Sequence, residues 1–132
     1  MLTALDHVTL TAADFAQAAA FYDAALGALD LTRVAELVDE EESGAEVEAA
    51  AWGPWGGSAM IWLIRGPTPT LGLHIQLRAA SRAQVETFFA AATTAGGTAH
   101  AEPRRWTPYR RGEYAATVSD PAGNLIEVVG AE

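Results

Sequence analysis

The sequence predicts an α+β fold built from two tandem βαβββ modules, residues 1–66 and 67–132. Short stretches of alternating apolar and polar residues indicate strands, and one stretch of helical spacing in each half indicates a helix. The halves also match at one fixed offset of 67 residues, which relates His7 to His74, Asp14 to Ser81, Gln17 to Gln84, Phe21 to Phe88, Tyr22 to Phe89, Pro54 to Pro121 and Gly56 to Gly123. One module is too small to bury its own sheet. We therefore expect the two to combine into one curved, eight-stranded mixed sheet with both helices outside.

The first half begins with a strand, because residues 5–10 alternate between apolar and polar side chains. Asp14 then provides a helix N-cap with Gln17 at the third helical position, followed by one apolar stripe made of Phe15, Ala18, Ala19, Tyr22, Leu26 and Leu29. Further strands are predicted over residues 31–38, 46–52 and 58–65. The acidic run at residues 39–44 is expected to be a solvated hairpin tip, since clustered like charges repel one another.

The second half follows a predicted linker, the Gly-Pro-Thr-Pro stretch at residues 66–69. The pattern then begins again with a strand over residues 72–77 and a helix capped by Ser81, which should bury Val85, Phe88, Phe89 and Ala92. A strand over residues 98–105 and a loop over residues 106–112 come next. Residues 113–130 form the last hairpin, around a turn at residues 120–124 where proline and glycine favour chain reversal.

Composition excludes several classes of function. Half of the 132 residues are apolar, which suits a single globular domain. The net charge is −9 and there is no lysine, which argues against nucleic acid or an anionic membrane surface as a partner. The absence of cysteine excludes disulfides, a thiolate nucleophile and sulfur-rich zinc sites. The N-terminal stretch has no basic leader region, so we expect a soluble, cytoplasmic protein. With nucleic acid and anionic membranes disfavoured, the expected partner is a small molecule.

One carboxylate, Glu127, interrupts the apolar run at residues 125–129. Strand alternation puts Glu127 on one face with Leu125 and Val129. An ionised carboxylate on a half-buried strand costs several kcal/mol unless a cation, a metal ion or a set of donors meets it. Glu127 therefore needs a partner, and one simple candidate is an ion pair with a nearby arginine: Arg78, Arg104 or Arg105.

The chain resembles the vicinal oxygen chelate superfamily, which includes glyoxalase I, bleomycin-resistance proteins and extradiol dioxygenases. The matching segments are LDHVTL and FYDAALG in the first half, then LHIQL, and DPAGNLIEVV at the end. The resemblance implies that the paired modules form a cup, with metal ligands on the first and last strands of a module. Carried over residue by residue, the implied ligands are His7, His74 and Glu127.

The residues themselves allow this set of ligands, because each lies on the strand face opposite aliphatic residues that would pack under a helix. Two imidazoles and one carboxylate suit iron(II), and zinc, manganese, nickel or cobalt would also fit. The alternative for the histidines is a structural role in half-buried strands. Thr9 and Gln76 share the histidine face, where they are expected to position ligands as hydrogen-bond donors and to contact the substrate.

The sequence departs from glyoxalase I at Met60, the residue 67 positions before Glu127, where a second carboxylate would be expected from the resemblance. The three-ligand set is more similar to that of the dioxygenases. Met60 and Trp62 would make one wall of the cup apolar and aromatic. His100, Tyr109 and Tyr114 are the candidates for proton transfer.

These observations predict a metal-dependent dioxygenase, lyase or isomerase that acts on a small oxygen-bearing molecule. The alternative is a metal-free protein that binds a small molecule, as bleomycin-resistance proteins do. Many proteins of the superfamily pair as homodimers, some exchanging modules, and a homodimer is the oligomer that the resemblance implies; the alternative is a monomer that closes its own two modules.

Overall fold

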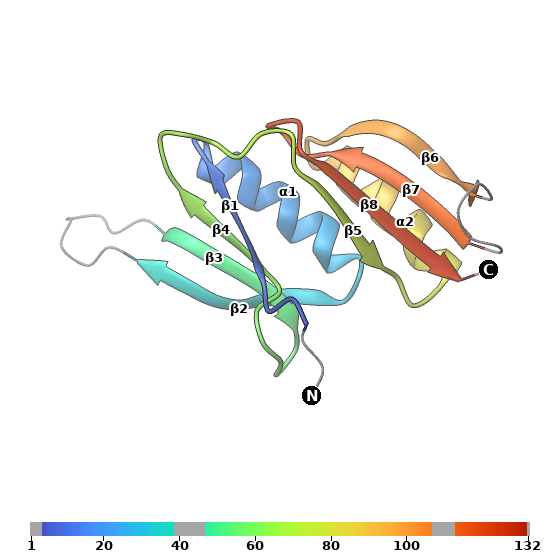
Figure 1. The fold of residues 1–132 in the computed structure, drawn as a ribbon, viewed down its shortest axis with the longest axis horizontal. Helices are drawn as coiled ribbons and strands as arrows, with labels where there is room; N and C mark the ends of the chain where they lie inside the picture. Colours follow the sequence, from blue (N-terminus) through green and yellow to red (C-terminus); the bar gives the residue numbers. More distant parts are fainter. Residues whose placement is uncertain (1–3, 39–46, 107–112, 132) are drawn as a thin grey trace.

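Two four-stranded sheets and two helices make up the structure, a computed structural model that describes residues 4–38, 47–106 and 113–131 (Figure 1). The first half of the chain supplies β1 (Val8–Ala12), α1 (Phe15–Gly27), β2 (Leu31–Val38), β3 (Val47–Pro54) and β4 (Ile61–Arg65). The second half supplies β5 (His74–Arg78), α2 (Arg82–Thr94), β6 (Thr98–Trp106), β7 (Glu113–Ser119) and β8 (Leu125–Ala131). The predicted tandem βαβββ order is confirmed.

The strand order is β1-β4-β3-β2 in the first sheet and β5-β8-β7-β6 in the second. In both sheets the first and last strands of the half pair in parallel, β1 with β4 and β5 with β8, and the other pairs are antiparallel. The expected single eight-stranded sheet is therefore divided in two. β1 and β5 are edge strands of their sheets, and they do not pair with each other. The described strands of one sheet make no pairing with those of the other.

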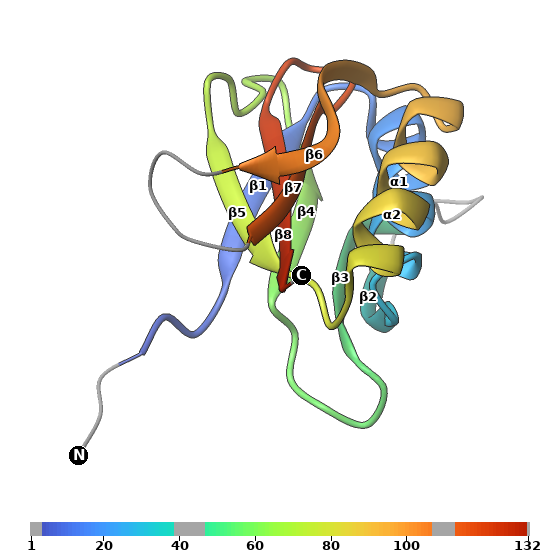
Figure 2. The ribbon, with the colours of Figure 1, turned by 90° about the vertical axis from the view of Figure 1, so that its right-hand side faces the viewer.

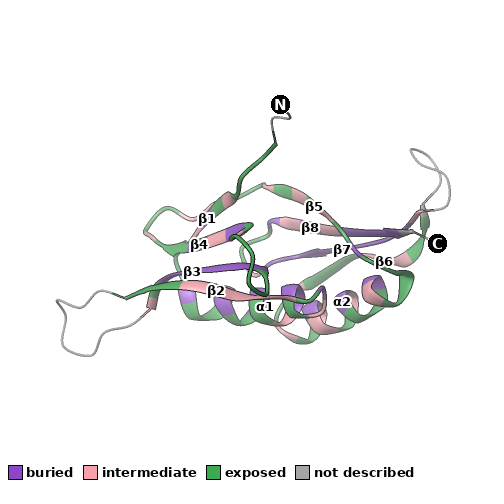
Figure 3. Cartoon of the chain, turned by 90° about the horizontal axis from the view of Figure 1, so that it is seen from below, coloured by how far each residue is buried: buried purple, intermediate pink, exposed green. Residues whose placement is uncertain are grey.

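Both helices lie on the same side of the sheets and next to each other (Figures 2 and 3). α1 contacts the strands of the first sheet and α2 those of the second. Large apolar side chains from both sheets point toward the helices and are buried there: Leu10, Trp52, Ile61, Leu63, Val118, Ile126 and Val128. The opposite side of each sheet, which we call its open face, is covered by neither of the two described helices.

Each helix begins where the sequence predicts. The Asp14 carboxylate accepts a hydrogen bond from Gln17 N at 3.1 Å, and Ser81 Oγ accepts one from Gln84 N at 3.2 Å. These contacts satisfy amides that the first helical turn leaves without intrahelical partners. The predicted apolar stripes are buried, except that Phe89 is half-buried. Neither helix, in the part of the chain described, is long and apolar enough to cross a membrane.

A buried hydrogen bond joins the two halves. Tyr22 Oη on α1 donates to Asp120 Oδ2, in the turn between β7 and β8, at 2.6 Å. Burial, together with the negative charge of Asp120 and this hydrogen bond, raises the pKa of Tyr22 far above its ordinary value. Asp120 also accepts hydrogen bonds from the backbone amides of Ala122 and Asn124, which hold the predicted turn in place.

The connection between the halves is hydrogen-bonded on both sides. Toward the first half, Thr70 N donates to Thr11 O at 2.9 Å and Thr70 Oγ1 accepts from Thr11 N at 2.9 Å. Toward the second half, Asn124 Nδ2 donates to Thr70 O and Asn124 Oδ1 accepts from Leu73 N. The two halves are thus fixed to their connector as well as to each other.

Candidate functional site

His74 and Glu127, two of the three predicted metal ligands, lie close together on the open face of the second sheet. His74 is the first residue of β5, and Glu127 lies in β8, the parallel neighbour of β5. His74 Nε2 is 3.9 Å from Glu127 Oε1. A cation bonded to each donor at about 2.1 Å fits within this separation. The pair therefore fits two positions in the coordination shell of one metal ion.

Thr117 holds the other oxygen of the Glu127 carboxylate. Thr117 lies directly opposite Glu127 in the pairing of β7 with β8, and its Oγ1 donates to Glu127 Oε2 at 3.3 Å. Among the residues that the structure describes, His74 and Thr117 are the polar partners of Glu127, and no arginine is in contact with it. Such a donor orients a carboxylate ligand and keeps its first oxygen directed toward the neighbouring imidazole.

His7, the third predicted ligand, does not join this pair within one chain. His7 lies one residue before β1, on the edge of the first sheet, and its side chain is 42% exposed. Its Nδ1 is 2.7 Å from Asp6 Oδ2, a contact that leaves Nε2 directed elsewhere. Residues 4–38, 47–106 and 113–131 of one chain contain no group of three or more histidine, cysteine or acidic side chains placed to hold a metal ion.

The strand pairing corrects the expected equivalence of Met60 and Glu127. In the second sheet Gln76 pairs with Glu127, and its counterpart in the first sheet, Thr9, pairs with Trp62. The two halves are thus related by 67 residues at the first strand but by 65 at the last. The segment at residues 55–60 is one residue longer than the segment at residues 120–124, which accounts for one residue of the shift. The other arises earlier in the chain, because Ala51 opposite Trp62 and Thr117 opposite Glu127 are already 66 residues apart. Trp62, not Met60, takes the place of Glu127 in the first half.

The open faces of the two sheets differ in character. The first carries neutral side chains, among them Thr9, Thr11, Ala49, Ala51, Trp62 and Ile64. Met60 lies beside this face, 40% exposed, and its backbone carbonyl accepts a hydrogen bond from Val8 N. The second open face carries His74, Gln76, Arg78, Thr117 and Glu127. One face is therefore an apolar wall and the other a polar wall with potential ligands.

The three residues predicted to transfer protons have different positions. Tyr114 points to the helix side of the second sheet, where its hydroxyl donates to Glu86 Oε1 on α2 at 2.9 Å. Tyr114 and Thr117 are three residues apart in β7, so their side chains lie on opposite faces of the strand. The Tyr114 side chain therefore faces away from Glu127. His100 is exposed on β6, the edge strand farthest from β5. Tyr109 lies outside the described residues.

Sequence reasoning missed Thr117, although the sequence contained the signal. Residues 120–124 form the turn, so counting outward from it pairs Ser119 with Leu125 and Thr117 with Glu127. A threonine opposite an acidic residue on one face of an antiparallel pair is within hydrogen-bonding distance. The hairpin register alone was therefore sufficient to find this contact.

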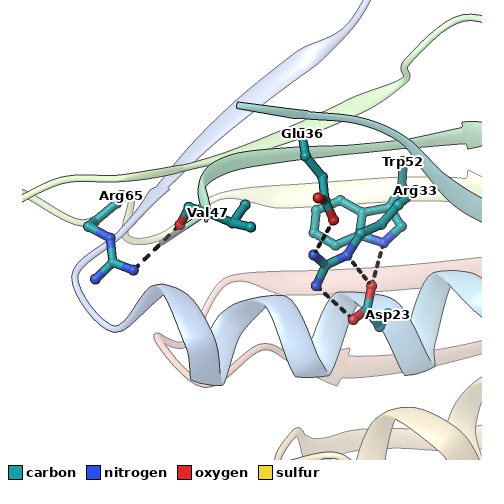
Figure 4. A network of polar contacts seen from close by, with 6 residues as sticks. All are labelled: Asp23, Arg33, Glu36, Val47, Trp52 and Arg65. Carbon is teal, nitrogen blue, oxygen red and sulfur yellow. Dashed lines mark hydrogen bonds and ion pairs between the residues drawn. The ribbon is translucent and has the colours of Figure 1, made fainter. Parts of the chain in front are cut away.

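A cavity of about 780 Å³ lies elsewhere, between α1 and the first sheet. Its charged lining includes Asp23 and Arg33, which make a two-point ion pair with nitrogen–oxygen distances of 2.8 Å (Figure 4). The hydrogen bond to Asp23 raises the pKa of Arg33. Glu36 and the Trp52 indole nitrogen complete the network. These charges satisfy one another, so the cavity has the features of helix-to-sheet packing rather than of a reaction site.

A family model described as the Glyoxalase/Bleomycin resistance protein/Dioxygenase superfamily matches residues 4–128. The chain belongs to this superfamily. The predicted resemblance is thereby confirmed, and the tandem βαβββ architecture described above is the fold of the solved superfamily members compared with it.

Two solved structures illustrate the likeness. A glyoxalase/bleomycin resistance protein from Albidiferax ferrireducens T118 is 24% identical, with a TM-score of 0.73 over 97% of this chain and 98% of that one. A lactoylglutathione lyase from Agrobacterium tumefaciens is 22% identical, with a TM-score of 0.65 over 98% and 94%. At these identities the likeness shows the fold alone. A comparison with curated proteins gives no match.

Proposed function

We propose that the protein is a metal-dependent enzyme acting on a small oxygen-bearing molecule, with His7, His74 and Glu127 as the metal ligands. The observation that carries the proposal is the His74–Glu127 pair. An imidazole nitrogen and a carboxylate oxygen stand 3.9 Å apart on an open sheet face, and a threonine holds the second carboxylate oxygen. This donor set suits iron(II), and it also accepts zinc, manganese, nickel or cobalt.

The third ligand comes from a second copy of the chain in this proposal. His7 lies on the edge of the first sheet and does not meet His74 and Glu127 of its own chain. In a homodimer with two-fold symmetry, the first open face of one copy meets the second open face of the other, and this contact occurs twice. The apolar wall around Trp62 then closes over the polar wall around Glu127, and each cup receives His7 from the opposite copy.

The bound metal would supply Lewis acidity, polarising two neighbouring substrate oxygens and stabilising the negative charge that develops on them. The side chains of the chain would orient the substrate around it. Gln76 and Thr9 are neutral hydrogen-bonding groups at corresponding places on the two walls. Trp62 gives a flat apolar surface that excludes water. Proton transfer is assigned to His100 or Tyr109, because the Tyr114 hydroxyl is turned toward α2.

Metal analysis of mixed variants tests both parts of the proposal. Protein purified without a histidine tag should bind about one metal ion per chain, and His7→Ala and Glu127→Ala should each lose most of it. When the two variants are unfolded together and refolded, half of the dimers are mixed, and each mixed dimer has one intact site. The mixture should then recover about a quarter of the wild-type occupancy.

Two outcomes would contradict the proposal. If wild-type protein holds less than about a tenth of an equivalent and Glu127→Ala leaves that unchanged, the metal site is wrong. If both single variants lose metal but their mixture regains none, the three ligands do not come from two copies. Sedimentation of the wild type gives the oligomeric state directly, and a monomer would exclude the shared site.

A metal-free binding protein is the second candidate, and the position of Trp62 favours it. The first half presents an indole where the second half has a carboxylate, so that wall offers an aromatic surface rather than a ligand. Such a surface suits a planar molecule, and the net charge of −9 suits a cationic one. This function predicts stoichiometric binding without turnover, lost in Trp62→Ala and unaffected by a chelator.

A further inference from the structure

A hollow beside the His74–Glu127 pair is lined by an arginine. Its volume is about 200 Å³, and its lining residues are Gln76, Leu77, Arg78 and Val129. Gln76 pairs with Glu127, and Arg78 pairs with Val129, two residues further along the same strands. Strands rise about 3.3 Å per residue, so the Arg78 backbone lies about 7 Å beyond the Gln76–Glu127 level.

From this placement we infer that Arg78, with Gln76, forms a carboxylate-binding subsite of the proposed metal centre. The inference rests on the proposed function and adds the substrate class. The substrate is a small organic acid whose carboxylate is separate from the two oxygens held by the metal. Arg78 is a specificity-determining residue in this assignment, and the acid group fixes which end of the substrate reaches the metal.

The contacts of Arg78 leave it available for an anion. Its described ion-pair partner is Glu113, with one nitrogen–oxygen distance of 3.4 Å. A strong guanidinium–carboxylate contact is shorter, about 2.8 Å, and often uses two nitrogens. The Arg78 side chain is 60% exposed, whereas that of Glu113 is only 16% exposed. Glu113 therefore orients the guanidinium from one side without occupying its full set of donors.

Gln76 supplies the neutral half of the subsite. Its side chain is exposed on the open face, and its amide makes no hydrogen bond to another described residue. A primary amide has two N–H donors, which can bind the second oxygen of a carboxylate. Val129 shares the open face with Arg78 but is only 3% exposed, whereas Leu77 points to the helix side and packs against the core, so the accessible lining is mainly polar. Gln76 and Arg78 lie two residues apart on the same face of β5, so their donors together match the two oxygens of a carboxylate.

The charge of the whole chain makes this arginine decisive. A protein with net charge −9 repels anions, and the subsite also lies near Glu127 and Glu113. The counterparts of Gln76 and Arg78 in the first half are Thr9 and Thr11, so the duplicated position is neutral there. A positive group on the polar wall therefore serves to bind an acid that would otherwise be excluded.

The test compares two probes, 3,4-dihydroxybenzoate and its methyl ester, at pH 7 with the metal-loaded dimer. The two differ in the charge of one group and share the vicinal oxygens. Wild type should bind the acid about tenfold more tightly than the ester, as expected for one partly solvated charge-assisted contact. Arg78→Gln should lose this preference while keeping its metal content and its affinity for the ester, and Arg78→Lys should keep part of it.

Arg82→Gln is the matched control. Arg82 is also an exposed arginine, 54% accessible and 3.9 Å from a glutamate, but it lies on α2, on the helix side of the sheet. Its substitution should leave the acid preference unchanged. A wild type without the preference, including one that binds neither probe, or a preference that survives in Arg78→Gln, overturns the subsite. Failure of the metal centre gives a different result, ester binding that a chelator does not change.

Discussion

Replacing Tyr22 with phenylalanine removes one buried hydrogen bond and little else. The Tyr22 hydroxyl donates to Asp120 Oδ2 at 2.6 Å, and both residues are at most 5% exposed. A hydrogen bond to a charged group contributes about 1.5–3 kcal/mol to stability. Asp120 would keep three other donors, namely the amides of Ala122 and Asn124 and the side chain of Asn124. We therefore expect a loss of about 2 kcal/mol, below the 3–5 kcal/mol typical of a buried charge left alone.

The loss has a pH signature that identifies its source. The pKa of Tyr22 in the folded protein is raised above its ordinary value of 10.0, chiefly by burial. Below pH 10 the unfolded tyrosine is also protonated, so the full contribution of this group is present. As pH rises above that value the unfolded state loses a proton that the folded state keeps. The wild type should therefore lose about 1.4 kcal/mol of stability per pH unit relative to Tyr22→Phe.

Urea unfolding at pH values from about 8 to about 11, on both sides of the ordinary tyrosine pKa, measures both effects. Tyr114→Phe is the control, since the Tyr114 hydroxyl donates to Glu86, whose side chain is 55% exposed, and should cost less than about 1 kcal/mol. A Tyr22→Phe variant as stable as wild type at pH 8 would contradict the contribution assigned to this hydrogen bond. A parallel loss of stability in both proteins above pH 10 would contradict the pH dependence expected from the raised pKa of Tyr22.

Further predictions concern the site and the packing between halves. Thr117→Val keeps the shape of the side chain but loses the donor to Glu127, so metal affinity should fall about tenfold with folding intact, as titration with a competing chelator would show. Equal affinities would mean that the threonine does not orient the ligand. Gly97→Ala would place a methyl group 2.6 Å from side-chain atoms of Phe21 and Val118, and should destabilise the fold by about 2 kcal/mol. Gly27→Ala meets no atom within 4 Å and serves as its control in thermal unfolding. A neutral Gly97→Ala would show that the two side chains move apart easily.

The fold could be predicted because its signals are local. Capping residues at Asp14 and Ser81, apolar stripes and turn residues each act over a few positions, and within the described residues they agree with the structure except for the half-buried Phe89. The division into two sheets could not be predicted, because edge pairing between β1 and β5 depends on how the halves dock. The halves dock through long-range contacts, among them the Tyr22–Asp120 hydrogen bond and the packing of α1 on α2, that no pattern in the sequence marks.

The part of the candidate site formed by the parallel pair β5–β8 and the hairpin β7–β8 was predictable from the sequence. His74 and Glu127 come together because β5 and β8 are neighbours in every module of this order. The equivalence of Met60 with Glu127 was wrong, since a fixed offset ignores differences in loop length between the halves. The position of His7 relative to the other two proposed ligands depends on the arrangement of whole modules, and sequence spacing carries no information about that.

The connector at Thr70 also affects how copies of the chain can associate. Hydrogen bonds join the connector to β1 through Thr11 and to the turn before β8 through Asn124. These bonds hold it against both halves and oppose its use as a hinge. In a domain-swapped dimer, both chains would first have to break the hydrogen bonds of the connector and the Tyr22–Asp120 hydrogen bond. Assembly from intact chains avoids that barrier. Lengthening the connector should therefore leave the proposed dimer unchanged, whereas removing the hydrogen bonds of Thr70 and Asn124 should favour dimers in which the two chains exchange halves.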